Sequence, residues 1–142
     1  MAHRKDILNQ LKQDLDDKLT VANGFESDLM QVVHGSPDMN DMMVFPIVGF
    51  MVDSDEVDTE YQGTNTRLRD LFITVYGIQE VSMEDTESYY DLMNDVENFF
   101  MSDYWTYKTT TTLGNMATFY GGVNDNKAYF ILEIVVKYEQ SF

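Results

Sequence analysis

Residues Met43–Gly77 decide the fold of this chain, because they hold two apolar segments on either side of an acidic one. Val44–Val52 is VFPIVGFMV, Asp53–Glu60 is DSDEVDTE, and Leu68–Tyr76 is LRDLFITVY. The apolar segments have the length and the β-branched composition of strands. Because proline cannot donate to a strand ladder, Pro46 predicts that the first strand begins at a sheet edge or ahead of regular pairing.

The acidic segment and the residues after it connect these two strands. We expect the second strand over Arg67–Gly77, so the connection spans Asp53–Asn65, which is too long for a tight turn. The sequence therefore predicts an acidic loop that projects from the sheet.

Two other segments have the periodicity of amphipathic helices. The first is Arg4–Thr20, with Asn23-Gly24 as its stop signal. The second is Glu84–Ser102, which Ser82 or Asp85 can cap. Their apolar stripes are expected to face the core, and consist of Ile7, Leu8, Leu11, Leu15 and Leu19 in the first helix and Tyr89, Leu92, Met93, Val96, Phe99 and Phe100 in the second.

Further strands are expected on both sides of the second helix. Leu29–Val33 predicts a short strand, and Tyr104–Thr112 predicts one rich in aromatic and β-branched residues. Leu113–Asn115 predicts a turn, after which Met116–Tyr120 continues that strand or pairs with it. The clearest strand is Ala128–Tyr138, whose alternation places Phe130, Leu132, Ile134, Val136 and Tyr138 on one face and Tyr129, Ile131, Glu133, Val135 and Lys137 on the other.

These elements predict a single α+β domain over residues 1–142, with a mixed or antiparallel sheet of about four to six strands. Two amphipathic helices suffice to cover one face of such a sheet. The other face stays partly apolar, because Tyr129, Ile131 and Val135 point toward it. An apolar face of this kind is typical of an interaction surface. We therefore expect an oligomer, with these three residues at the subunit interface.

The charge of the chain excludes several functions. Its 142 residues carry 25 acidic and 9 basic side chains, a formal net charge of −16, and no cysteine. Such a surface repels nucleic acid, and the absence of cysteine excludes disulfides and thiolate chemistry.

No apolar run is long enough for a membrane span, and no leader pattern is present, so we expect no association with a membrane.

The acidic segment is also a candidate metal site, with Asp53, Asp55, Glu56, Asp58 and Glu60 as oxygen ligands. A calcium loop needs a glycine at its sixth position and an acid at its twelfth, and the segment has neither. Neither histidine belongs to a spaced motif, and no nucleophile elbow is present. We therefore expect no catalytic residue, no metal and no cofactor. A small metal-dependent enzyme or ion-binding module that uses Asp53–Glu60 remains the alternative from a different class.

Two arginines stand out in so acidic a chain. Arg67 and Arg69 are two residues apart in a predicted strand, so both point toward the face of Leu71, Ile73 and Val75. They are candidates for pairing with carboxylates across a subunit interface. The alternative is an ion pair within the chain.

The order of these segments resembles that of the tail terminator proteins of long-tailed bacteriophages, the group typified by the lambda tail terminator. The resemblance covers about Ile7–Glu139 and lies in the order of elements more than in any single motif. The shared elements are an amphipathic first helix, the Phe-Pro strand at Val44–Val48, an acidic segment, the Arg67–Tyr76 strand, a second helix, an aromatic strand and an apolar last strand ending in Tyr138-Glu139.

The resemblance implies a structural protein of the virion. In this family a ring of six copies binds the last ring of the tail tube protein, stops its polymerisation and presents a surface to the head–tail connector in the neck. The acidic loop would then contact the tube or the lumen, through which DNA passes without specific binding. The protein would assemble in the host cytoplasm and end in the tail or neck. The alternative of the same class is another neck or tail-completion protein.

Overall fold

The computed structural model describes residues 4–35, 44–62, 66–82, 85–120 and 126–141. These residues form two α-helices, five strands and two short 3₁₀ helices. The α-helices are α1 (Arg4–Lys18) and α2 (Glu87–Met101), the strands are β1 (Gln31–His34), β2 (Ile47–Gln62), β3 (Thr66–Glu80), β4 (Thr111–Tyr120) and β5 (Lys127–Ser141), and the 3₁₀ helices are η1 (Val21–Asn23) and η2 (Lys108–Thr110).

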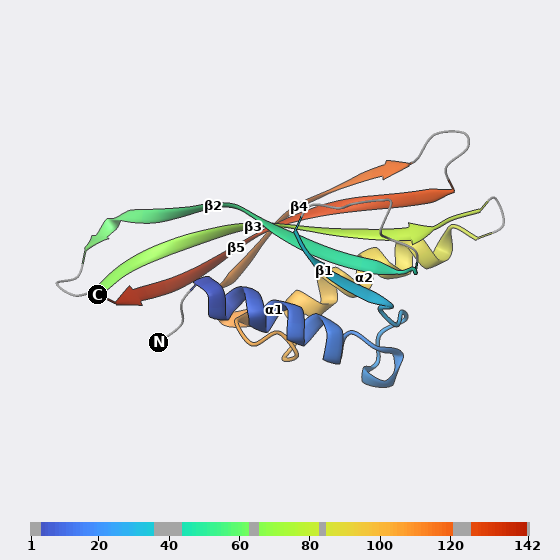
Figure 1. Cartoon of the computed structure of the whole chain (residues 1–142), viewed down its shortest axis with the longest axis horizontal. Coiled ribbons are helices and arrows are strands. Elements are labelled where there is room, and N and C mark those ends of the chain that lie inside the picture. Colours follow the sequence, from blue (N-terminus) through green and yellow to red (C-terminus); the bar gives the residue numbers. More distant parts are fainter. Residues whose placement is uncertain (1–3, 36–43, 63–65, 83–84, 121–125, 142) are drawn as a thin grey trace.

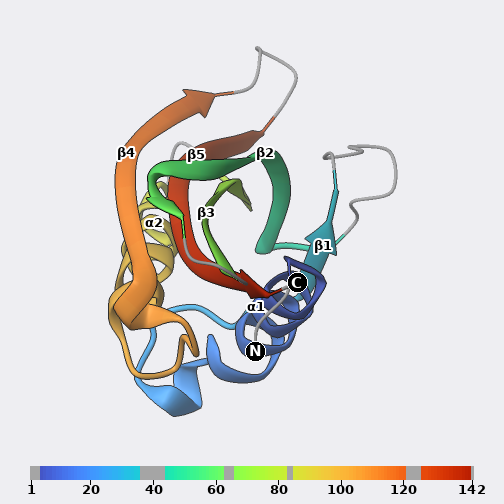
Figure 2. The same cartoon turned by 90° about the vertical axis from the view of Figure 1, so that its left-hand side faces the viewer.

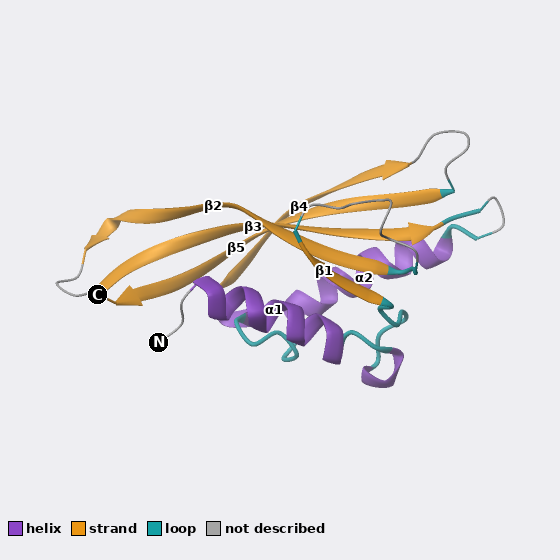
Figure 3. Cartoon of the chain, in the orientation of Figure 1, coloured by secondary structure: helices purple, strands orange, loops and turns teal. Residues whose placement is uncertain are grey.

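The strands form one mixed sheet in the order β1-β2-β3-β5-β4. β1 runs parallel to β2, and the other neighbouring pairs are antiparallel. Both helices lie on the same side of this sheet (Figure 1, Figure 3), and the end-on view in Figure 2 shows that the sheet is curled. The predicted α+β class, with two helices on one sheet face, is confirmed.

The core lies between the helices and the covered face of the sheet. The apolar stripe of α1 is buried as predicted, with Ile7, Leu11 and Leu15 fully inside. The helix ends at Lys18, two residues earlier than predicted. The Asn23 side-chain amide donates to the Lys18 carbonyl over 2.9 Å and satisfies that helix end.

The first apolar strand begins as its proline predicts. Pro46 lies directly before β2, and its carbonyl accepts a hydrogen bond from the Met30 amide at 3.0 Å. β1 then covers the outer edge of β2 over Ile47–Phe50. Val48 and Phe50 point to the helices and are fully buried.

The structure of the acidic segment differs from the predicted loop. β2 continues through Gln62, so residues 53–62 are strand and not loop. Ser54–Val57 pair with Phe72–Arg69 of β3. Acidic residues are poor strand formers, but the opposite strand supplies a positive charge, and cross-strand pairs of opposite charge stabilise a sheet. Residues 63–65 of the expected loop lie outside the described residues.

The strand predicted over Tyr104–Thr112 is also wrong. The chain makes turns there, followed by η2, and β4 begins only at Thr111. Tertiary contacts override the local β propensity: Trp105 is 1% exposed in the core. The buried carboxylate of Asp14 on α1 accepts hydrogen bonds from the amide (3.0 Å) and the hydroxyl (2.7 Å) of Thr106.

The turn predicted at Leu113–Asn115 lies instead within β4. The register against β5 shifts between Leu113 and Met116, so the Gly-Asn pair makes an irregularity in the strand. A Cβ atom on Gly114 would lie 3.0 Å from the Glu133 carbonyl oxygen. Glycine therefore permits a close approach of two strands here rather than a change of direction.

Candidate functional site

The face of the sheet opposite the helices carries the most distinctive surface of the described chain. Phe119 of β4 and Tyr129 of β5 stack on it, with ring centroids 5.0 Å apart and ring planes 13° from parallel. Their side chains remain 39% and 38% exposed. Ile131 and Val135 of β5 and Phe72 of β3 lie half-buried on the same face. We call these five residues the open-face patch.

The neighbouring part of the same face, over β2 and β3, is covered by its own side chains. Tyr76 of β3 lies across Gly49 of β2, where an added Cβ would come 2.2 Å from the ring. Its hydroxyl donates to the Gly35 carbonyl over 2.9 Å, and it packs with Ile47 and Ile78 in a small second core. Burial raises the pKa of Tyr76 to about 12. Among the described residues, the part of the face toward β5 and β4 is therefore the part that is left open.

A hollow of about 280 Å³ lies on this open part, where β2, β3, β5 and β4 meet. Its apolar lining includes Phe72, Leu113 and Val135, and the carboxylates of Glu56 and Glu133 also line it. It is a shallow depression of mixed character, and its apolar lining overlaps the open-face patch.

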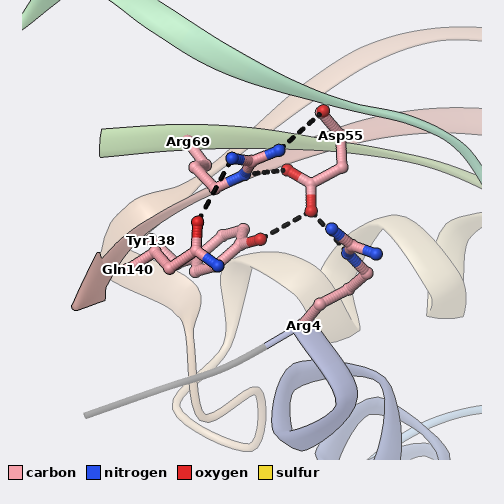
Figure 4. A network of polar contacts seen from close by, with 5 residues as sticks. All are labelled: Arg4, Asp55, Arg69, Tyr138 and Gln140. Carbon is pink, nitrogen blue, oxygen red and sulfur yellow. Dashed lines mark hydrogen bonds and ion pairs between the residues drawn. The ribbon is translucent and has the colours of Figure 1, made fainter. Parts of the chain in front are cut away.

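A polar cluster lies on the opposite, helix-covered side of the sheet (Figure 4). One oxygen of the Asp55 carboxylate accepts from Arg4 Nε at 2.5 Å and from the Tyr138 hydroxyl at 2.5 Å. The other oxygen accepts from Arg69 Nε at 3.0 Å. Arg69 also donates to Gln140 Oε1 at 3.2 Å and to the Asp55 carbonyl at 3.3 Å. We call these five residues the Asp55 cluster.

A register shift in β2 places Asp55 in this cluster. Val48, Phe50 and Val52 alternate toward the helices, and the pairing with β3 skips Asp53. The extra residue reverses the alternation, so Asp55, opposite Leu71, points to the helix side.

Burial and hydrogen bonding compete in setting the pKa of Asp55. Burial pushes this pKa upward, but the hydrogen bonds from Tyr138, Arg69 and Arg4 outweigh it and hold the pKa below its usual value. Burial and the Asp55 carboxylate together raise the pKa of Tyr138. The carboxylate is thus a fixed anion that joins three strands to the start of α1, and its lone pairs are already engaged.

The residues predicted for a subunit interface divide into two groups. Tyr129, Ile131 and Val135 lie together on the open face, as their alternation predicted. Arg69 lies on the helix side, and its ion pair with Asp55 is within the chain, which was the alternative interpretation. Arg67 is exposed on β3 opposite Gln140 of β5, and it does not belong to the open-face patch.

The predicted acidic ligands do not converge. Asp53 accepts from the Thr74 hydroxyl at 2.5 Å on the open side, whereas Asp55 points to the helix side. Glu56 is exposed in β2, and the backbones of Asp58 and Glu60 continue the same strand. Among the described residues, no three histidine or acidic side chains come close enough to hold a metal ion.

The sequence analysis missed Phe119 and the Asp55 cluster. Phe119 lies opposite Tyr129 in the register of β4 against β5, a pairing that the sequence analysis did not predict. The Asp55 cluster had no sequence signal, because it depends on the register shift in β2 and on partners up to 83 positions from Asp55.

Fold and site together define a small α+β protein with a helix-covered face, an apolar open face and an acidic surface. No protein-family model matches the chain, and no curated protein matches it. Within the described ranges, neither α-helix is long and apolar enough to cross a membrane.

Proposed function

We propose that this chain is a structural assembly protein, the ring-forming tail terminator of a long-tailed bacteriophage. Six copies would form a ring that caps the tail tube, stops its polymerisation and provides the surface to which the head–tail connector joins. Its partners would be its own copies, the tail tube protein and the neck protein. The protein would work in the virion without a cofactor.

The open-face patch is the observation that carries this proposal. Two stacked aromatic side chains, each more than a third exposed, lie on this face beside the half-buried Ile131, in a chain of net charge −16. The half-buried Phe72 and Val135 lie farther along the same face, beyond the exposed Glu133. Aromatic residues are enriched at protein–protein interfaces, and exposed apolar surface usually has a partner. Covering this patch would stabilise an assembly.

The order of elements and the charge give further support. The order helix, two strands, helix, two strands (α1, β2, β3, α2, β4, β5) is that of the resemblance, with the acidic segment inside β2 and the strand after α2 beginning at Thr111. A ring of such acidic subunits would have a negative lumen, which repels DNA and lets it pass.

The metal-dependent alternative has less support. Asp53 and Asp55 point to opposite sides of the sheet, and Asp55 is already engaged by three donors. The alternative within the same class is another neck or tail-completion protein, and the deletion experiment below distinguishes it from a tail terminator.

The oligomeric part of the proposal is tested by light scattering on purified protein, alone and with tail tube protein. A ring of six subunits of 16.5 kDa has a mass of about 99 kDa. Tyr129→Glu should abolish this species, because it places a charge in the patch. Tyr90→Glu is the matched control, since Tyr90 is a 49% exposed aromatic on α2, away from the patch. Equal effects of the two variants would contradict the role of the patch.

The terminator role is tested by deleting the coding sequence from the phage genome. Without a terminator, tails should have abnormal lengths and fail to join filled heads. Tails of normal length that fail to join heads would indicate another neck protein instead. Infectious particles with normal tails would overturn both the terminator role and the alternative role as a neck protein.

A further inference from the structure

The sheet has two long strand edges that no described residue pairs with. β4 is the last strand of the sheet, and its ten residues pair with β5 alone. On the opposite edge, β1 and Gly35 pair with β2 only as far as Phe50. Within the described residues, the outer edge of β2 therefore has no partner from Met51 to Gln62, and the strand is regular there over Met51–Val52 and Ser54–Val57. Each edge presents a row of backbone donors and acceptors that can bind another strand.

The two edges differ in how they are protected against such pairing. The outer part of β2 has five acidic residues between Asp53 and Glu60, of which Asp53 and Glu56 are exposed and Asp55 is paired within the chain. β4, Thr111–Tyr120, has no charged residue and no proline. Its irregularity lies near its start, and from Met116 to Tyr120 its register with β5 is regular. Proteins usually protect a long edge strand with charges or proline, so an edge without either suits a strand that is paired in the assembly.

Charge selects the partner of each edge. Pairing of two β2 edges is disfavoured, because it brings the exposed acids Asp53 and Glu56 of two copies together, and like charges opposite one another destabilise a sheet. Two β4 edges can pair, but they would form a closed twofold dimer and leave both β2 edges open. Pairing β4 with β2 opposes no like charges and uses both edges. Because the two edges are different, this contact repeats head to tail, the kind of contact that closes into a ring.

We propose that the β4 edge of one copy pairs with the outer edge of β2, Met51–Gln62, in the next copy. The sheets of neighbouring subunits are then continuous around the ring. The added strand lies beside Phe119, so its side chains on the open face pack against the Phe119–Tyr129 stack and cover it from the β4 side. This inference rests on the proposed ring and names the contact that closes it.

Thiol cross-linking tests the contact directly, since the chain has no cysteine of its own. Ala117→Cys in β4 and Glu56→Cys in β2 place exposed thiols on the open face of the two edges. With a short bismaleimide, an equimolar mixture of the two single variants should give cross-linked dimer, and each variant alone should give little. The double variant should give a ladder that ends at six chains. Dimer from Ala117→Cys alone, or none from the mixture, overturns the proposal.

Charge variants at Ala117, which is exposed on the open face of β4 as Glu56 is on β2, provide a second measurement that needs no cross-link. Ala117→Lys next to the exposed acids of the β2 edge should tighten subunit association a few-fold, and Ala117→Glu should weaken it by a similar factor. Pairing between two β4 strands would instead make both variants weaken association, and that result overturns the proposal. Far-UV circular dichroism checks that both variants fold.

These outcomes separate the edge contact from the proposed function. A 99 kDa ring without the β4–β2 cross-link refutes the edge contact and leaves the terminator role standing. A β4–β2 cross-link together with normal tails in the deletion phage refutes the terminator role and leaves the contact standing. Absence of any oligomer, with or without tube protein, refutes both.

Discussion

Replacing Asp55 with asparagine keeps the size of the side chain and removes the charge that three neighbours share. The Asp55 side chain is 7% exposed, and that of Arg69 is 15% exposed. The asparagine amide oxygen could still accept from the Tyr138 hydroxyl, but the Arg69 guanidinium would lose its anionic partner. The substitution therefore tests how much the cluster stabilises the sheet.

The magnitude follows from the exposure of each partner. A hydrogen bond between charged groups contributes about 1.5–3 kcal/mol when it is shielded from water, which applies to Arg69. The ion pair with Arg4, whose side chain is 51% exposed, adds about 0.5 kcal/mol. We expect Asp55→Asn to lower the free energy of unfolding by about 3 kcal/mol in total. For a chain of this size that corresponds to a fall in Tm of about 10 °C.

Guanidinium denaturation, followed by the fluorescence of the only tryptophan, measures this loss. Asp53→Asn is the matched control, because Asp53 is an exposed acid of the same strand and should cost about 0.5 kcal/mol. In a double-mutant cycle, Asp55→Asn and Arg69→Gln should show a coupling energy above about 1 kcal/mol. A loss for Asp55→Asn no larger than that of the control would refute the reasoning.

Four further predictions concern pH, packing and the surroundings of the tryptophan. The pKa of Asp55 is lower in the folded chain than in the unfolded chain, so the unfolded state takes up the proton first. The free energy of unfolding that the Asp55 charge contributes should thus be fully present above about pH 4 and be lost as the pH falls through the lower folded-state pKa. In acid, wild type and Asp55→Asn should therefore have the same free energy of unfolding. In an ultraviolet titration under conditions where the protein stays folded, Tyr76 should ionise near pH 12, and ionisation near pH 10 would contradict its burial. Gly49→Val should cost more than about 2 kcal/mol, because its Cβ collides with Tyr76, and a neutral result in denaturation would show that the ring moves aside freely. Finally, the fluorescence of Trp105 should be blue-shifted and resist iodide quenching in the native state, because the indole is buried and bonded to Thr111 at 2.8 Å.

Much of the fold could be predicted from local patterns. The alternation over Ala128–Tyr138 identified the buried and the open face of β5, because side chains of a strand alternate whatever it pairs with. The apolar stripes identified both helices, since each must bury one side. From these, the sequence also predicted that Tyr129, Ile131 and Val135 lie outside the helix-covered core.

The errors have one physical origin, which is tertiary contact. Tyr104–Thr112 has strand propensity, but burial of Trp105 and the bonds from Asp14 to Thr106 impose turns. Asp53–Gln62 has the composition of a loop, but pairing of Ser54–Val57 and Gln62 with β3 extends the strand through it. Propensity is a weak preference, and a few buried contacts outweigh it.

The sequence by itself determined the two helices, the apolar alternation of the last strand and the strongly negative charge, because each is a property of neighbouring residues or of composition. Only the tertiary structure decided where the acidic segment lies and what Asp55 does. Its partners are Arg4, Arg69 and Tyr138, from 14 to 83 residues away, and the register shift in β2 turns it toward them. The same strand pairing leaves β4 and the outer half of β2 as the two open edges, because a strand's neighbours are set by the whole sheet and not by its own residues.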